Sequence, residues 1–261
     1  MPFEPIFAPI IQGNLIVRLA EDEAEMNTAQ RLRYRIFCEE MGGKANPEVQ
    51  RQKRDFDKFD DVCDHMLVID DTRPVGDKVV GTYRLITRPH VKDIGHFYSE
   101  SEYDVSCIKA WPGEILELGR SCVEVPYRTR PVLQLLWKGI GAYIVAKNIE
   151  VMFGCASFTG TQIREHQLTL AYLYHNHLAP EELRPKALPD QYVNMNLMAK
   201  EAIDARSALV GMPPLIKGYL RLGGYIGEGA VIDHAYNTTD VSIVVKTDAI
   251  TGKYAQRYMN E

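Results

Sequence analysis

The sequence predicts a mixed α/β fold with one central, mostly antiparallel, twisted sheet that has helices on both faces. Three observations support this prediction. Short apolar or alternating runs recur along the chain, longer runs with helical spacing separate them, and turns containing Pro or Gly join neighbouring runs. The order is strand, helix, two or three antiparallel strands, helix, strand, helix and final strands. Helices interleaved with strands in this way are expected to cover both faces of a sheet.

The first half of the chain contains one predicted helix and three predicted strands. Apolar or alternating runs predict strands at 14–19, 65–70 and 78–86, the last two joined as a hairpin. Residues 22–40 have helical spacing, and Gly42-Gly43 ends that helix. The apolar face of the helix consists of Met26, Ala29, Leu32 and Ile36. A polar stretch, 44–64, follows this helix and is dense in charges of both signs.

The second half continues the alternation. Strands are predicted at 115–125 and 151–158, and helices at 131–148 and 163–176. The stretch 177–214 is richer in Pro and polar residues and is predicted to be a connecting arm. A helix at 214–223 and a hairpin of 225–232 with 241–246 close the chain. We therefore expect residues 1–261 to form a single domain.

Composition limits the classes of protein and partner. The chain of 261 residues has 46% hydrophobic and 25% charged residues, as expected of a globular protein. Its 30 basic and 35 acidic residues leave no basic surplus, which argues against a nucleic-acid partner. The apolar stretches break well short of the roughly 20 residues that span a bilayer. The N-terminus lacks the basic region and cleavage site of a signal peptide, so we expect a cytoplasmic protein.

Cysteines and histidines predict no metal centre. The five cysteines are odd in number and form no CxxC pair, which fits a reducing cytosol better than disulfides or zinc. His175 and His177 have the spacing of a metal-binding pair, but they lack a third ligand at suitable spacing. A helix C-terminus is the favoured interpretation of these histidines.

Four groups of residues carry chemistry, each within a segment that also has a structural interpretation. They are Arg33 with Phe37 on a helix, Asp57 with Asp60 in an acidic run, Arg84 in a strand, and Glu117 with Arg120 in a strand. Their spacing places Arg33 and Phe37 on one helix face and Glu117 and Arg120 on opposite faces of a strand. Any one group taken alone is better explained as a surface charge network.

The ordered set of four groups resembles the signature of the acyl-homoserine-lactone synthases. These are GNAT-fold enzymes that take acyl chains from acyl carrier protein. The resemblance covers residues 33–120, in order and with similar gaps. It departs from that family where a tryptophan is expected after Phe37 and this chain has Gly42-Gly43. The C-terminal half also differs from that of a lactone synthase.

A second resemblance spans nearly the whole chain. The segments that carry it are RYRIFCEEMG (33–42), FDDVCDHMLVID (59–70), GTYRL (81–85), ELGRSCVEVPYR (117–128), LLWKGIGAYI (135–144), FGCASFTG (153–160) and PPLIKGYLRLGGYIGEGAVID (213–233). They are similar to the bacterial L-ornithine Nα-acyltransferases of the GNAT superfamily. This resemblance implies transfer of a 3-hydroxyacyl group from acyl carrier protein to the α-amine of L-ornithine, the first step of ornithine lipid synthesis. It implies no cofactor besides the carrier's phosphopantetheine thioester.

The turn before the helix at 131–148 bears on the acyl donor. Enzymes that use coenzyme A usually bind its pyrophosphate on a Gly-rich loop that opens a helix. Here the turn is PYRTRP, which has no glycine, and Pro131 removes one N–H donor. Arg128 and Arg130 supply positive charge instead. We expect them to contact the single phosphate of the phosphopantetheine arm or the acidic surface of a carrier protein.

Acyl transfer to ornithine needs a base and groups that bind the substrate. The substrate amine arrives as an ammonium and must lose a proton before it attacks the thioester. Glu117 is the predicted general base, directly or through water, because a carboxylate in that strand would lie beside the thioester. Arg84 or Arg120 is expected to bind the substrate carboxylate, and Asp57 or Asp60 its second ammonium. Arg33 and Phe37 complete the predicted substrate site. A structural ion network shaping the site is the competing role for Arg33, Asp57, Asp60 and Arg120.

Three alternatives stay open at this point. One is a lactone synthase that uses S-adenosylmethionine, and another is an N-acyltransferase that acts on a different amino acid. A third, from outside the enzymes, is a module that only binds acyl carrier protein. Peripheral contact with the inner face of the cytoplasmic membrane is also left open, because the implied product is lipid-like.

Overall fold

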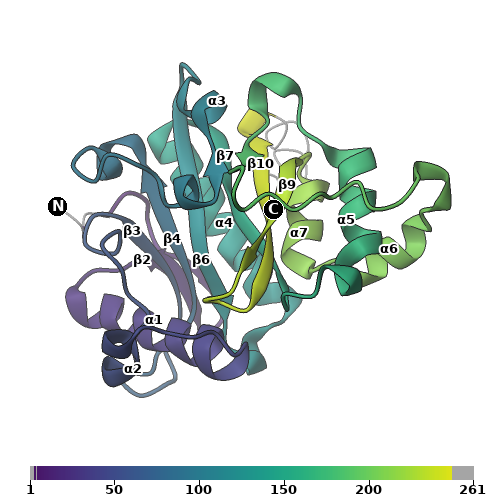
Figure 1. The fold of residues 1–261 in the computed structure, drawn as a ribbon. Helices are drawn as coiled ribbons and strands as arrows, with labels where there is room; N and C mark the ends of the chain where they lie inside the picture. The colour runs from purple at the N-terminus through teal and green to yellow at the C-terminus, as the bar shows by residue number, and fades with distance from the viewer. Residues whose placement is uncertain (1–2, 4, 249–261) are drawn as a thin grey trace. The chain divides into compact units, whose positions relative to one another are not determined.

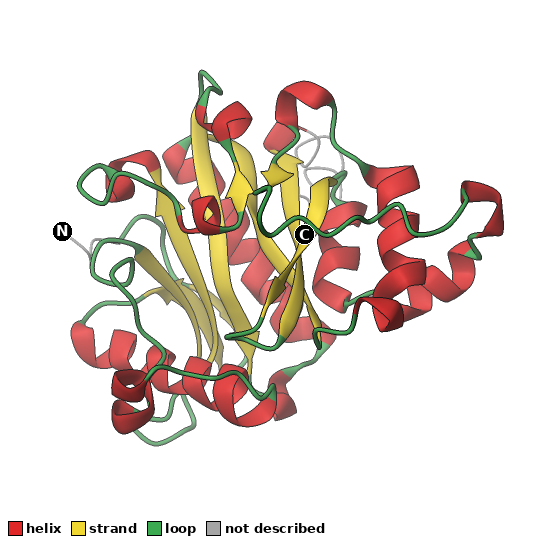
Figure 2. Ribbon diagram, in the orientation of Figure 1, coloured by secondary structure: helices red, strands yellow, loops and turns green. Residues whose placement is uncertain are grey.

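The computed structural model describes residue 3 and residues 5–248, which divide into two compact units (Figure 1). The first unit contains the described residues up to His96 and Leu118–Asn148. The second contains Phe97–Glu117 and the described residues from Ile149 onward. Both units contain strands and helices, and β6 (Glu114–Val123) contributes residues to each. Figure 2 shows the helices and strands of the described residues in separate colours.

In the described part of the chain, ten strands form one mixed, mostly antiparallel sheet, which confirms the predicted fold class. Their order in the sheet is β1-β2-β3-β4-β6-β7-β10-β9-β8-β5. The bounds are β1 Ile10–Gln12, β2 Leu15–Leu19, β3 Asp64–Asp70, β4 Val79–Thr87, β5 Tyr103–Asp104, β6 Glu114–Val123, β7 Ile149–Thr159, β8 Lys186–Ala187, β9 Tyr225–Asp233 and β10 Thr238–Lys246. Strand β6 pairs with β7 in parallel, and β8 with β9, whereas β7 pairs with β10 antiparallel.

The α-helices are α1 Glu23–Tyr34, α2 Pro47–Gln52, α3 Ser106–Lys109, α4 Arg130–Lys147, α5 Ile163–His177, α6 Ala205–Gly211 and α7 Pro214–Arg221. Helix α2 lies in the polar stretch 44–64, to which the sequence analysis assigns no element. Its N-cap is Asn46, whose side chain accepts from two backbone N–H groups, and Pro47 opens the helix. None of the helices in the described part of the chain is long and apolar enough to cross a bilayer.

In the first unit, α1 and α4 pack on opposite faces of the strands. Successive side chains of β3 alternate between the faces. Leu67 and Ile69 belong to one buried cluster with Leu32 of α1. On the other face Gly139 of α4 approaches so closely that a Cβ there would lie 2.7 Å from the sulfur of Met66. The helices therefore cover both faces of this part of the sheet.

Helix α1 begins at a capped turn and ends in a change of helix type. The Asp22 carboxylate accepts from the N–H of Glu25 at 2.8 Å, which satisfies one of the unpaired donors of the first turn. The predicted helix 22–40 continues past Tyr34 as a π-helix, Arg35–Glu40. Such wider turns are frequent at functional sites.

In the second unit, β10 lies between β7 and β9, with α5 packed on β9 and α7 on β10. One face of β10 presents Val241, Ile243 and Val245, all buried. Between α5 and α7, in the stretch predicted to be a connecting arm, lie the short strand β8, two 3₁₀ turns and α6.

Candidate functional site

Four of the predicted site residues meet with Arg33 in one buried ion network of the first unit. Arg33 is fully buried and binds both oxygens of Asp60, at 2.7 and 3.0 Å, while its Nε donates to Asp55 at 2.7 Å. The full set is Arg33, Asp55, Asp57, Asp60, Arg84 and Arg120, here called the arginine–aspartate network. Asp55 was missed by the sequence analysis, because nothing distinguishes it within its acidic run.

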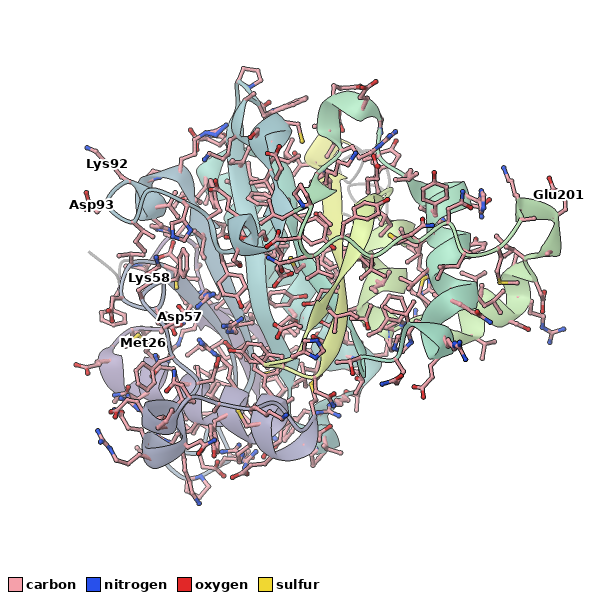
Figure 3. The ribbon with its side chains drawn as sticks, in the orientation of Figure 1. Met26, Asp57, Lys58, Lys92, Asp93 and Glu201 are labelled. Carbon is pink, nitrogen blue, oxygen red and sulfur yellow. The ribbon has the colours of Figure 1, made fainter. Side chains whose placement is uncertain are left out.

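Asp57 is the most exposed carboxylate of the network. Its two oxygens accept from Arg84 at 2.7 Å and from Arg120 at 3.2 Å. The Asp57 side chain is 26% exposed, against 1% for Asp60. Figure 3 shows Asp57 beside Lys58 on the segment between α2 and β3. Asp57 is thus the network's carboxylate nearest to solvent.

The loop between α2 and β3 is folded by its own aspartates. Lys53 ends α2 in a left-handed conformation (φ 50°), which redirects the chain. The N–H of Asp57 then donates to Asp60, and the N–H of Phe59 donates to Asp57. Carboxylates that bind nearby backbone N–H groups favour turns over helix. The acidic run therefore forms a turn that points its aspartates at Arg33 and Arg84.

Arg120 reaches this loop from a kinked strand. Its φ is +49°, a conformation that non-glycine residues seldom adopt within a strand. From there its Nε lies 3.2 Å from Asp55, and its Nη2 donates to Asp57. Strained backbone of this kind is often found at functional sites.

The network holds its charges ionised. Burial raises the pKa of the Asp60 carboxyl, but the Arg33 guanidinium outweighs burial, and the net pKa lies well below the ordinary value. Burial lowers the pKa of the neighbouring His65, which leaves the imidazole neutral at pH 7. Asp60, Cys63 and His65 lie close enough to ligate a metal, but both oxygens of Asp60 already accept from Arg33. We therefore assign Asp60 to the arginine–aspartate network and not to a metal site.

The remaining predicted residues of the first unit lie outside the network. Phe37, in the π-helix, packs against the buried apolar cluster beneath α1. Arg128 forms a bidentate ion pair with Glu40 and donates from Nε to the carbonyl of Val123. Arg130 is exposed and is the first residue of α4. The Thr129 side chain makes no capping hydrogen bond to this helix, and Pro131 in its first turn has no N–H to donate.

Glu117 belongs to the second unit, on β6. Only 2% of it is exposed, and its carboxylate accepts from the N–H groups of Tyr98 and Ser99, at 2.9 and 2.6 Å, and from the Ser99 hydroxyl. The parallel register pairs Glu117 with Phe153 of β7, and the Phe97 ring packs edge-on against the Phe153 ring. The 3₁₀ turn Tyr98–Ser101 thus closes over the Glu117 carboxylate.

The cysteines on the strands near the arginine–aspartate network and Glu117 are packing residues. Cys122 is buried in the cluster beneath α1, and burial raises the pKa of its thiol to about 12. Burial likewise raises the pKa of Cys155 well above its usual value. A nucleophilic cysteine needs a lowered pKa, so neither thiol is suited to attack a thioester.

Comparison with known proteins points to one family. Residues 32–138 match the family model described as an acetyltransferase (GNAT) domain. The chain is 48% identical to the L-ornithine Nα-acyltransferase of Agrobacterium fabrum, over 95% of this chain and 86% of the relative. It is 46% identical to the enzyme of that name from Rhodobacter capsulatus, over 93% of both chains.

One solved structure is similar over nearly its whole length. It is FeeM, an N-acyl amino acid synthase from uncultured soil microbes, with a TM-score of 0.52 and 12% identity over 94% of this chain and 95% of that one. At that identity the likeness shows the fold alone. Together with the family model, it confirms the predicted GNAT-like architecture.

Proposed function

Because the chain belongs to the L-ornithine Nα-acyltransferase family, we propose that it transfers an acyl group from a thioester to the α-amine of L-ornithine. The product is an N-acylated ornithine, the lyso form of an ornithine lipid. The observation that carries this proposal is identity near one half to enzymes of that name over more than nine-tenths of the chain.

We propose acyl carrier protein, loaded with a 3-hydroxyacyl chain, as the donor. The turn before α4 has no glycine, and Pro131 lies in the first turn of α4 itself. This segment is therefore a poor match for a loop that binds pyrophosphate. The uncapped start of α4 and the exposed Arg130 suit a single phosphate or an acidic carrier surface. Arg128, already paired with Glu40, contributes less free charge.

Glu117 is the proposed general base, acting directly or through one water. The α-amine of ornithine arrives protonated and must lose a proton before it attacks the thioester carbonyl. Three hydrogen bonds from Tyr98 and Ser99 fix the orientation of this carboxylate. Backbone N–H groups of β6 are proposed to stabilise the oxyanion that forms.

The first unit is proposed to bind the carboxylate of the amino acid. Arg84 and Arg120 are the candidates, since a guanidinium binds a carboxylate through two parallel hydrogen bonds. Both are oriented by Asp57, which is the exposed member of the network. In this role Arg33, Asp55 and Asp60 act by holding the loop that positions them.

The test is product analysis with defined substrates. The purified protein is incubated with 3-hydroxyacyl-carrier protein and, separately, ornithine, lysine, glutamine, glycine or S-adenosylmethionine, and products are identified by mass. The proposal predicts acylated ornithine as the dominant product. An acyl-homoserine lactone would show a lactone synthase, and a different acylated amino acid would correct the substrate. Carrier binding without turnover on any amine would show a binding module.

A further inference from the structure

A row of polar side chains runs along one face of β10, in the middle of the second unit's strands. Thr238, Asp240 and Ser242 alternate with the apolar residues of β10 and therefore share the opposite face. Thr238 pairs with Asp233 of β9, and Ser242 with Cys155 of β7. All three side chains of the row are buried. A buried central strand is usually apolar, so a polar row there needs an explanation.

Three carboxylates converge on this row. One oxygen from each of Glu102, Asp233 and Asp240 lies within 4.8 Å of the others, and Glu102 and Asp240 are buried. We call these three residues the acidic cluster. Carboxylates this close repel one another when ionised, and a cation between them relieves the repulsion.

Two hydroxyls of the row also point to a ligand. Thr238 is 2% exposed and Ser242 is 0% exposed. Among the residues that the structure describes, neither Thr238 Oγ1 nor Ser242 Oγ has a hydrogen-bond partner. They flank Asp240 on the same face, two residues to either side. Buried hydroxyls normally find partners, so this site is suited to a polar ligand that supplies them.

The acidic cluster and Glu117 are connected through one short segment. Ser99 donates to Glu117, and the Cys155 sulfur lies 3.6 Å from the Ser99 hydroxyl. Three residues on, the N–H of Glu102 donates to the carbonyl of Ser99 at 3.1 Å. The register places the Glu117–Phe153 pair on the same face as Cys155, Ser242 and Asp240. The proposed base and the cluster thus share one face of the second unit.

We propose that the acidic cluster binds the side-chain ammonium of the amino-acid acceptor. This inference rests on the proposed function, since it supplies the recognition of ornithine's second amine. An ammonium has three N–H donors in a compact charge, which matches three converging carboxylates. Asp57 and Asp60, the residues predicted for this role, already accept from Arg84, Arg120 and Arg33.

Binding of this kind would distinguish the two amines on one substrate. If the δ-ammonium lies among the carboxylates, it stays protonated and is not a nucleophile. The α-amine then lies on the Glu117 side of the same face. The acidic cluster is thus a specificity-determining site for the acceptor, and it takes no part in the bond that forms.

The test compares ornithine with norleucine, which has a methyl group in place of the side-chain ammonium. Equilibrium binding of each amino acid is measured by calorimetry with wild-type protein, Asp240→Asn, Ser242→Ala and the control Glu228→Gln. Glu228 lies on β9 but pairs with Lys186 outside the cluster. We expect wild-type protein and the control to prefer ornithine. Asp240→Asn should weaken ornithine binding by about 10- to 100-fold and leave norleucine unchanged.

Ser242→Ala distinguishes ligand recognition from a structural role. Removing a buried hydroxyl without a partner should leave the melting temperature unchanged or raise it, while ornithine still loses affinity relative to norleucine. Equal binding of the two amino acids by wild-type protein would overturn the inference, as would an equal loss of both in Asp240→Asn. Stabilisation of wild-type protein by Mg²⁺ or Ca²⁺ alone, lost in Asp240→Asn with the ornithine preference intact, would show a metal site instead.

The binding experiment also separates this inference from the proposed function. If wild-type protein acylates no amino acid but binds ornithine more tightly than norleucine through Asp240, only the proposed reaction fails. If ornithine is acylated, and Asp240→Asn prefers ornithine to norleucine as strongly as wild-type protein does, only the role of the acidic cluster fails.

Discussion

The arginine–aspartate network of the first unit and the acidic cluster of the second are both buried groups of charge, but their composition differs. The network joins three guanidinium groups to three carboxylates in direct ion pairs. The acidic cluster brings together three carboxylates beside two unpartnered hydroxyls within the described part of the chain. A balanced network mainly maintains structure, whereas a cluster of one sign is suited to a cationic ligand.

The largest expected effect is on turnover and concerns Glu117, which lies in the second unit with the acidic cluster. Glu117→Gln keeps the size of the side chain but cannot accept a proton. We expect kcat to fall by about 10²- to 10⁴-fold with little change in KM. Raising the pH should partly restore the rate, because more ornithine then arrives deprotonated.

Ser99→Ala is the matched control for Glu117, since it removes one hydrogen bond to the carboxylate and leaves the base. Steady-state kinetics at several pH values distinguish the two variants. Near-normal kcat for Glu117→Gln at neutral pH would show that the carboxylate only anchors the Tyr98–Ser101 turn.

The second effect is on stability and concerns the network. Arg33→Ala leaves Asp55 and Asp60 buried without their main cation, so the unfolding free energy should fall by about 3–5 kcal/mol. Arg51→Ala is the control, because Arg51 is exposed and its pair with Glu48 is worth less than about 0.5 kcal/mol. Urea unfolding measures both. A loss below about 1 kcal/mol for Arg33→Ala would contradict a structural role for the network.

The third expected effect is on the pH dependence of stability and concerns His65, which neighbours the network. Burial lowers the pKa of His65 in the folded protein, so the unfolded chain binds the proton more readily. The contribution of His65 to the unfolding free energy is therefore fully present above its unfolded pKa of about 6.5. It is lost as the pH falls towards the lower pKa of His65 in the folded protein.

The change in unfolding free energy with pH that is attributable to His65 cannot exceed about 1.4 kcal/mol per pH unit. His65→Gln should remove part of the decline in unfolding free energy between pH 7 and 5. His234→Gln, in the exposed turn between β9 and β10, should not. Unfolding curves with equal pH dependence in wild-type protein and His65→Gln would assign the decline to other groups.

The smallest effect concerns exposed charge, which belongs to neither cluster. Arg130→Ala should raise KM for the acyl carrier protein by about 2- to 5-fold and weaken its salt dependence, with KM for ornithine unchanged. Arg128→Ala should raise KM for the acyl carrier protein by a smaller factor, because Arg128 is paired with Glu40. Equal use of the matched acyl-coenzyme A would argue against a carrier-protein donor.

The sequence was enough to predict the fold class and to select five residues that the structure brings together in the network. Helical and strand spacing located most elements, and the resemblance selected Arg33, Asp57, Asp60, Arg84 and Arg120. These residues meet in one network because of the turn between α2 and β3. Hydrogen bonds between aspartate side chains and backbone N–H groups hold this turn, and the spacing of residues in the sequence does not reveal them.

The acidic cluster could not be predicted from the sequence. Glu102 lies in a segment without periodicity, and Asp240 lies ahead of the predicted strand 241–246, whereas β10 begins at Thr238. Aspartate is depleted in strands, so its presence moved the predicted boundary. The register between β9 and β10 brings Asp233 and Asp240 together. A polar residue at every second position from 238 to 242 was the signal available.

The central claim is that ornithine is acylated on its α-nitrogen while the acidic cluster retains the δ-ammonium. The most direct measurement is to incubate wild-type protein with 3-hydroxyacyl-carrier protein and ornithine labelled with ¹⁵N at the α position, and to locate the amide by NMR. The account predicts an amide at the labelled nitrogen. An amide at the δ-nitrogen, or none at all, would contradict it.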